Sequence, residues 1–136
     1  MQRVINPKER TDLIEVEVLN VGAQEFTLGT NPKLREATKI FKIEAFNFTQ
    51  IPVSPSGKVV INITVFNKSA IKLINNANTE LRAVPLYSIS KNVNGTEMPF
   101  VDTNQIDPEK SKIVVGSAAG LVLNEVFLLA VTYERP

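Results

Sequence analysis

The sequence predicts an all-β fold: an antiparallel two-sheet sandwich of jelly-roll-like form, with about 8–10 strands. Short apolar runs alternate with a period of two, and Pro, Asn and Gly interrupt them at intervals of roughly ten residues. No stretch sustains the period of a helix. The 136 residues suffice for one domain that buries its core without disulfide bonds, which fits the absence of cysteine.

The first half of the chain is expected to supply three strands before its first proline-rich break. Residues 13–19 alternate cleanly, with branched aliphatic residues on one face and two glutamates on a solvated second face. After a turn at Asn20–Gly22, residues 25–28 form a short strand and residues 38–48 a long one. The long strand is expected to place Phe41, Ile43 and Ala45 on one face and Ile40, Phe46 and Phe48 on the other. Aromatic rings on the second face predict that a second sheet edge or a neighbouring subunit partly covers it.

Pro52 and Pro55 break the chain, and alternation resumes beyond them. Residues 58–66 are predicted to form a strand whose inward residues are Val59, Ile61, Ile63 and Val65. A shorter strand over 70–74 precedes an asparagine-rich turn. The strand predicted over 81–89 contains Pro85, which places it at a sheet edge or a bulge because proline has no N–H for the ladder.

The last third of the chain alternates strands with well-marked turns. Asn92–Gly95 is typical of a hairpin turn, and Asp107 begins a turn through its own side chain. The remaining strands are expected at 98–101, 112–115, 121–123 and 125–134. Because 125–134 is apolar on both faces, it is predicted to be a central strand.

Residues 1–12 are predicted to be an N-terminal arm, and residues 13–136 a single β-sandwich domain. The arm is polar and carries three basic residues: Arg3, Lys8 and Arg10. These side chains are candidates for contact with nucleic acid or a lipid head group, with a solvated tail as the alternative.

The composition removes most catalytic and metal-binding chemistry. With no His and no Cys, the chain has no Ser-His-Asp triad, no thiol nucleophile and no Cys-based zinc site. The net charge of +1 argues against binding nucleic acid over the whole surface. The start of the chain has no apolar core of signal-peptide length, and the longest apolar run, 126–131, is too short to cross a bilayer as a helix. We therefore expect a soluble, non-enzymatic protein without a cofactor, a metal ion or a small-molecule substrate.

Two serine arrangements are candidates for a nucleophile. Ser117 lies in a Gly-bounded loop that is not G-x-S-x-G, so a tight loop between strands is favoured. Ser111 with Lys110 or Lys112 would form a Ser-Lys pair, but neighbouring residues on a strand point to opposite faces.

Two acidic arrangements are candidates for a glycosidase pair and a cation site. Glu15 and Glu17 share a strand face at about 7 Å, close to a glycosidase spacing, but the chain lacks the tryptophans that stack on sugars. Residues 102–107 offer oxygen ligands for a cation such as calcium, without the glycine and terminal glutamate of an EF-hand. An exposed strand face and a solvated turn are the favoured interpretations.

Four asparagines lie in triplets that match the glycosylation acceptor pattern: Asn47, Asn62, Asn67 and Asn94. Such triplets arise by chance in β proteins rich in Asn and Thr. We interpret them as turn and edge chemistry.

One family resemblance emerges from the order of features along the chain. The features are Ile43–Ala45 followed by Ile51–Gly57, then Glu80–Tyr87, Asn94-Gly-Thr before Phe100, Ile106–Ser111 and Leu128–Tyr133. This order resembles small single jelly-roll structural proteins of tailless icosahedral bacteriophages. It covers most of the chain after residue 13 and concerns strand order, so it assigns no role to an individual residue.

The resemblance implies a virion component: a capsid, penton (vertex) or minor capsid subunit. Its partners would be copies of itself in a symmetric multimer and other virion proteins. The alternative from a different class is a carbohydrate- or protein-binding β-sandwich module of a surface protein.

Overall fold

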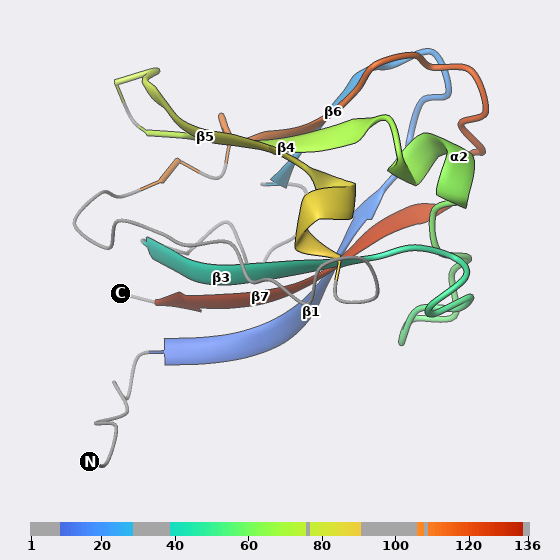
Figure 1. The fold of residues 1–136 in the computed structure, drawn as a ribbon, viewed down its shortest axis with the longest axis horizontal. Coiled ribbons are helices and arrows are strands. Elements are labelled where there is room, and N and C mark those ends of the chain that lie inside the picture. The colour runs from blue at the N-terminus through green and yellow to red at the C-terminus, as the bar shows by residue number, and fades with distance from the viewer. Residues whose placement is uncertain (1–8, 29–38, 76, 91–105, 108, 135–136) are drawn as a thin grey trace.

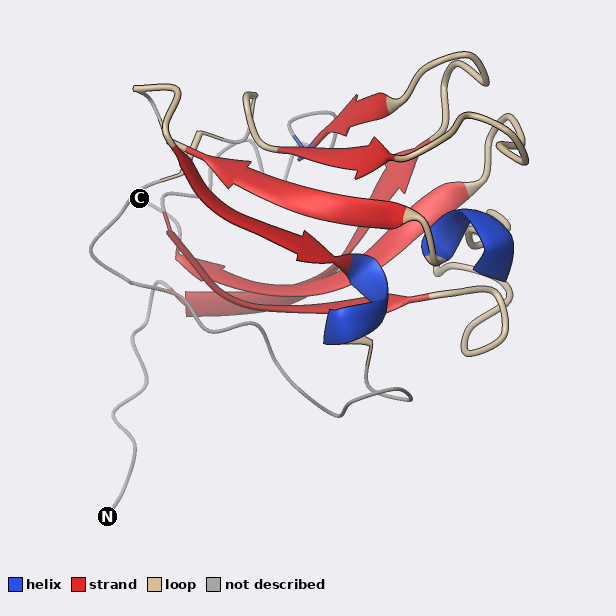
Figure 2. Ribbon diagram, turned by 45° about the horizontal axis from the view of Figure 1, so that its top comes forward, coloured by secondary structure: helices blue, strands red, loops and turns tan. Residues whose placement is uncertain are grey.

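Two antiparallel sheets stack face to face in the computed structural model (Figure 1, Figure 2). The structure describes residues 9–28, 39–75, 77–90, 106–107 and 109–134. Of these residues, 46% are in strands and 9% in helices, which confirms the all-β prediction.

The first sheet has three strands in the order β1 (Glu9–Glu17), β7 (Val126–Glu134), β3 (Lys39–Phe46). The second has four, in the order β2 (Glu25–Thr27), β6 (Lys112–Val115), β4 (Ser69–Ile74), β5 (Glu80–Pro85). From β1 to β4 the chain changes sheet at each connection, and it changes sheet again between β6 and β7. Repeated crossing between two sheets is typical of a jelly roll.

The main core lies between the sheets and is built by alternate residues of both. Ile14 and Ile43 from the first sheet and Ile71 and Ile113 from the second are fully buried. The rings of Phe26 and Phe127 meet across the interlayer space with centroids 5.5 Å apart. The predicted central strand is confirmed, because β7 pairs with β1 on one side and with β3 on the other.

The first strand begins earlier than predicted. Residues 9–12, assigned to the arm from the sequence, pair with residues 131–134 of β7. The Tyr133 hydroxyl donates to Asp12 Oδ2 at 2.7 Å, and the Thr11 and Thr132 hydroxyls lie 2.8 Å apart. Polar side chains that looked solvated in sequence are thus partners of β7, and the arm boundary at residue 12 is wrong.

The prediction of a strand over residues 58–66 is also wrong. Isolated bridges join Val53 to Val59 and Val60 to Val126, and the chain then forms a short helix, α2 (Ile63–Phe66). Asn62 caps this helix, because its Oδ1 accepts the Val65 N–H at 2.9 Å. The predicted inward face holds only in part. Ile61 and Val65 are buried, whereas Val59 and Ile63 are exposed and Val60 and Phe66 are buried instead.

Smaller departures have local causes. In β3 a register shift between Ile40 and Lys42 lets Ile40 and Ile43 both reach the core, against strict alternation. The strand expected over 81–89 ends at Pro85, where the short helix η2 (Leu86–Ile89) begins, and its edge position is confirmed. Residues 121–123 form a turn region rather than a strand, and the strand expected at 98–101 lies outside the described residues.

Introducing a carboxylate into β7 tests its central position. We expect Val131→Asp to prevent folding, because Val131 is fully buried and a carboxylate there costs several kcal/mol. Ala83→Asp is the control: Ala83 is exposed on edge strand β5, opposite Lys72. The measurement is thermal unfolding, and equal melting temperatures for the two variants would contradict the assignment.

Two truncations test the corrected start of β1. A chain that begins at Leu13 loses the Asp12–Tyr133 hydrogen bond and four residue pairs of the ladder, whereas one that begins at Glu9 keeps them. We expect the shorter chain to unfold at a clearly lower denaturant concentration than the longer one. If both unfold at the same concentration, residues 9–12 contribute nothing to the sheet.

Candidate functional site

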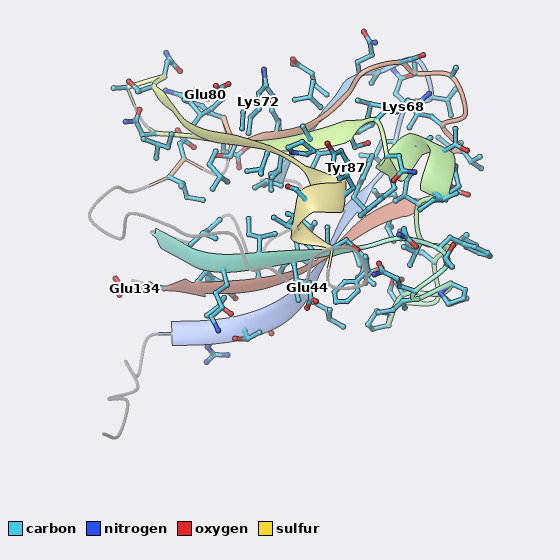
Figure 3. The ribbon with its side chains drawn as sticks, viewed as in Figure 1. Glu44, Lys68, Lys72, Glu80, Tyr87 and Glu134 are labelled. Atoms are coloured by element: carbon cyan, nitrogen blue, oxygen red, sulfur yellow. The ribbon has the colours of Figure 1, made fainter. Side chains whose placement is uncertain are left out.

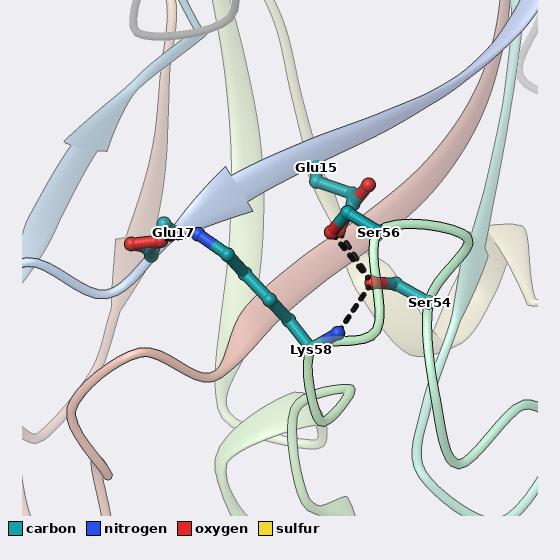
Figure 4. Close-up of polar contacts among 5 residues, drawn as sticks. All are labelled: Glu15, Glu17, Ser54, Ser56 and Lys58. Atoms are coloured by element: carbon teal, nitrogen blue, oxygen red, sulfur yellow. Dashed lines mark hydrogen bonds and ion pairs between the residues drawn. The ribbon is translucent and has the colours of Figure 1, made fainter.

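The predicted carboxylate pair on β1 is tied to the loop that follows β3 (Figure 4). Glu15 Oε1 accepts hydrogen bonds from the hydroxyls of Ser54 and Ser56, and Glu17 forms an ion pair with Lys58. Ser54 Oγ also accepts the backbone N–H of Lys58 at 3.2 Å. The outer side of β1, predicted to be solvated, is therefore covered here by residues 54–58.

The same loop continues over part of the outer face of the three-stranded sheet. Val60 packs on Val126 and Leu128 of β7, with Phe46 and Ile51 beside them, in a small second core. Ile61 N–H donates to the Val126 carbonyl at 2.8 Å, and the Val126 N–H donates to the Val59 carbonyl at 3.0 Å. The chain itself therefore covers Phe46, one residue of the aromatic face expected on β3, whereas Phe48 of that face is 46% exposed.

This arrangement gives Glu15 and Glu17 a structural role. Each carboxylate is engaged by a different partner, so they do not form a facing acid–base pair around an open space. Glu15 and Glu17 therefore lie on a strand face, as favoured from the sequence. This face is bonded to the loop after β3 rather than fully solvated.

The serine candidates likewise take part in local structure. Ser111 is fully buried, and its hydroxyl accepts the Ile74 N–H at 2.9 Å, while Lys112 pairs with Glu25 at 3.0 Å. Ser117 Oγ accepts the Ala119 N–H at 3.2 Å within an exposed loop. Neither hydroxyl is placed beside a base by these contacts.

The remaining candidates fall partly outside the described residues. Asp107 begins the predicted turn, since its Oδ1 accepts the Glu109 N–H at 3.0 Å, but most of the proposed cation loop at 102–105 is not described. Within the described ranges no cluster of acidic side chains could hold a metal ion. Arg10 lies exposed in β1 opposite Tyr133, and Arg3 and Lys8 lie outside the described residues.

Two of the asparagine triplets have a clear structural use: Asn47 lies in a turn, as predicted, whereas Asn62 caps a helix where a strand was predicted. Asn47 is buried and its Oδ1 accepts the Thr49 N–H at 2.9 Å in the turn after β3, while Asn62 caps α2. Asn67 ends that helix, and Asn94 lies outside the described residues.

An open depression of about 320 Å³ lies beside β2 and β6. Its lining consists of Glu25, Thr27, Ile74, Asn78, Glu109, Lys110 and Lys112. The lining mixes both signs of charge and contains no aromatic ring, so it lacks the stacking surface of a sugar site.

A different surface stands out by its lack of charge. Residues 18–24, 47–67 and 116–124 meet at one end of the sandwich, on the right in Figure 1 beside α2, and we name them the α2 end. Within these three segments the sole charged residue is Lys58, which is neutralised by Glu17. Lys72, Glu80 and Glu134 lie toward the opposite end of the sandwich, whereas Lys68 lies beside α2 at the border of the α2 end (Figure 3).

The α2 end also carries most of the exposed large apolar side chains. Eight of the ten such residues in the described part of the chain belong to it: Leu19, Val21, Phe48, Val53, Val59, Ile63, Val122 and Leu123. Their exposed fractions run from 43% to 64%. Exposed apolar groups that gather in one area mark an interaction surface, whereas scattered ones carry no such meaning.

Hydrogen bonds fix the three segments of the α2 end against one another. The Asn124 N–H donates to the Val18 carbonyl at 2.9 Å, and Asn62 Nδ2 donates to the Gly120 carbonyl at 3.1 Å. Asn62 Nδ2 also lies 3.3 Å from Glu125 Oε1. Burial raises the pKa of the Glu125 carboxyl above its usual range, and the hydrogen bond from Asn62 partly offsets this effect.

Sequence reasoning did not identify the α2 end, although a signal was present. Three separate stretches nearly without charge, in a chain with 15 basic and 14 acidic residues, are visible in the sequence. Each one looks like an ordinary Gly- and Asn-containing loop. Only the topology brings them to the same end.

No protein-family model, curated protein or solved structure matches this chain. No helix in the described part of the chain has the length and hydropathy needed to cross a membrane. The resemblance to phage structural proteins therefore stays a prediction.

Removing the Glu15 carboxylate tests its role in holding the loop. We expect Glu15→Ala to lower the free energy of unfolding by roughly 1–2 kcal/mol, because two serine hydroxyls lose a charged acceptor. Hydrogen exchange should accelerate at the Lys58 and Val60 amides. The control is Glu44→Ala on β3, expected within about 0.5 kcal/mol of the parent, and an equal effect of the two changes would contradict the role.

Proposed function

We propose that this protein is a non-enzymatic structural subunit of a virus particle that acts by assembling with copies of itself and with other virion proteins. The observation that carries the proposal is the concentration of exposed apolar side chains at one nearly uncharged end of a two-sheet unit. Such a surface gains free energy by leaving water, which is the usual driving force of protein association.

Two further observations support the same proposal. The strand order has the repeated sheet crossing of a jelly roll, which is the fold that the sequence resemblance implies. Each candidate catalytic group has a structural partner. Ser111 and Ser117 accept backbone N–H groups, Glu15 accepts two serine hydroxyls, and Glu17 pairs with Lys58.

A capsid, penton or minor capsid position would suit such a subunit. The basic residues near the N-terminus, Arg3, Lys8 and Arg10, are proposed to contact nucleic acid, lipid head groups or a neighbouring subunit there. The alternative is a protein-binding module of a surface protein. The exposed apolar side chains of the α2 end would suit this function as well, and the test below distinguishes the two.

Size-exclusion chromatography with light scattering tests the proposal directly. We expect a defined multimer whose mass is an integral multiple of the 15.0 kDa chain, visible as uniform particles by electron microscopy. A monomer at all accessible protein concentrations would reject self-assembly and favour the binding module.

A further inference from the structure

The α2 end presents large apolar side chains from all three of its segments. Eight of them are each 43% to 64% exposed. Apolar side chains gathered at one end of a domain are typical of an interaction site.

The surface is held in place before any partner arrives. Lys68 borders α2, and its Nζ donates to the Ala119 carbonyl at 2.5 Å, while the Gly116 N–H donates to the Lys68 carbonyl at 2.9 Å. Ser54, Ser56 and Lys58 anchor the loop after β3 to β1. A partner therefore has little loop ordering to impose, which reduces the entropic cost of binding.

The charge distribution indicates what kind of surface fits there. Lys58 is paired with Glu17, so the single charge within the α2 end is balanced. At its border lie one cation, Lys68, whose Nζ donates to a neutral carbonyl, and one anion, Glu125, beside Asn62. A bilayer contact usually adds basic residues and Trp or Tyr at the interface, and the α2 end contains no Trp, no Tyr and no unpaired lysine. A protein surface that is itself apolar and uncharged therefore fits the α2 end better than a charged ligand or a bilayer.

We propose that the α2 end binds the same end of a second copy of this chain. A neutral apolar surface is its own complement, as a self-complementary contact requires, whereas a surface with net charge would repel its copy. The inference rests on the proposed self-assembly and adds to it the surface and the partner.

Two aspartates in the α2 end test the contact. Leu19→Asp and Leu123→Asp, combined in one chain, place unpaired carboxylates at positions 64% and 52% exposed, so folding should be retained. In a self-complementary contact these charges would be buried and repel each other, and we expect association to weaken about 100-fold or more. The control is Tyr87→Asp, which changes a 45% exposed residue outside the α2 end.

Light scattering over a concentration series, with melting temperature measured in parallel, gives the readout. A smaller mass for the double variant and the parent mass for Tyr87→Asp would support the inference. A parent-sized multimer for both variants would overturn it and leave self-assembly standing, whereas a monomeric parent would overturn self-assembly itself. Sedimentation of a monomeric parent with phosphatidylcholine vesicles, lost in the double variant, would assign the surface to a bilayer instead.

A single cysteine provides a second measurement that does not depend on charge. Because the chain has no Cys, Val122→Cys introduces a unique thiol on the α2 end, and Tyr87→Cys introduces one elsewhere. We expect a short bifunctional maleimide to link Val122→Cys into dimers much faster than Tyr87→Cys. Equal rates of linking would contradict an interface at the α2 end.

Discussion

Strand β7 is buried on both faces and paired along both edges, and the rest of the structure is arranged around that constraint. Its inner face packs against the second sheet through contacts such as Phe127 with Phe26. Its outer face would expose Val126 and Leu128 to water if residues 47–60 did not fold back over them. The hydrogen bonds of Glu15 with Ser54 and Ser56 hold that loop closed, so polar contacts on β1 protect an apolar strand beside it.

The parts of the fold that sequence predicted well are those whose patterns reflect burial. Apolar residues on both faces of 125–134 identified the central strand, and Pro85 identified an edge. Residues 58–66 misled because their alternation resembles a strand, whereas the Asn62 side chain bonds the backbone locally and starts a helix. The bulge between Ile40 and Lys42 could not be predicted from the sequence either, because it depends on the register in which β3 pairs with β7.

The candidate site was predictable to a smaller extent because its parts are distant in sequence. Glu15 and Ser54 are 39 residues apart, and the sequence around either residue does not predict contact with the other. The α2 end draws on three loops that become one surface through sheet topology. What the sequence does contain is the absence of charge from those loops, and this signal acquires meaning only when the three are known to be neighbours.

The order of the strands along the chain has a consequence for how the protein is made. β7 lies between β1 and β3, yet it follows both of them in the sequence. On the ribosome, β1 and β3 therefore emerge with their shared partner still unsynthesised, and their inward isoleucines have no completed sheet to pack in. Pairings of such long sequence separation form slowly, and the exposed strands are prone to aggregate in the meantime. Production of this protein should therefore depend on chaperones that shield nascent chains until β7 has left the ribosome.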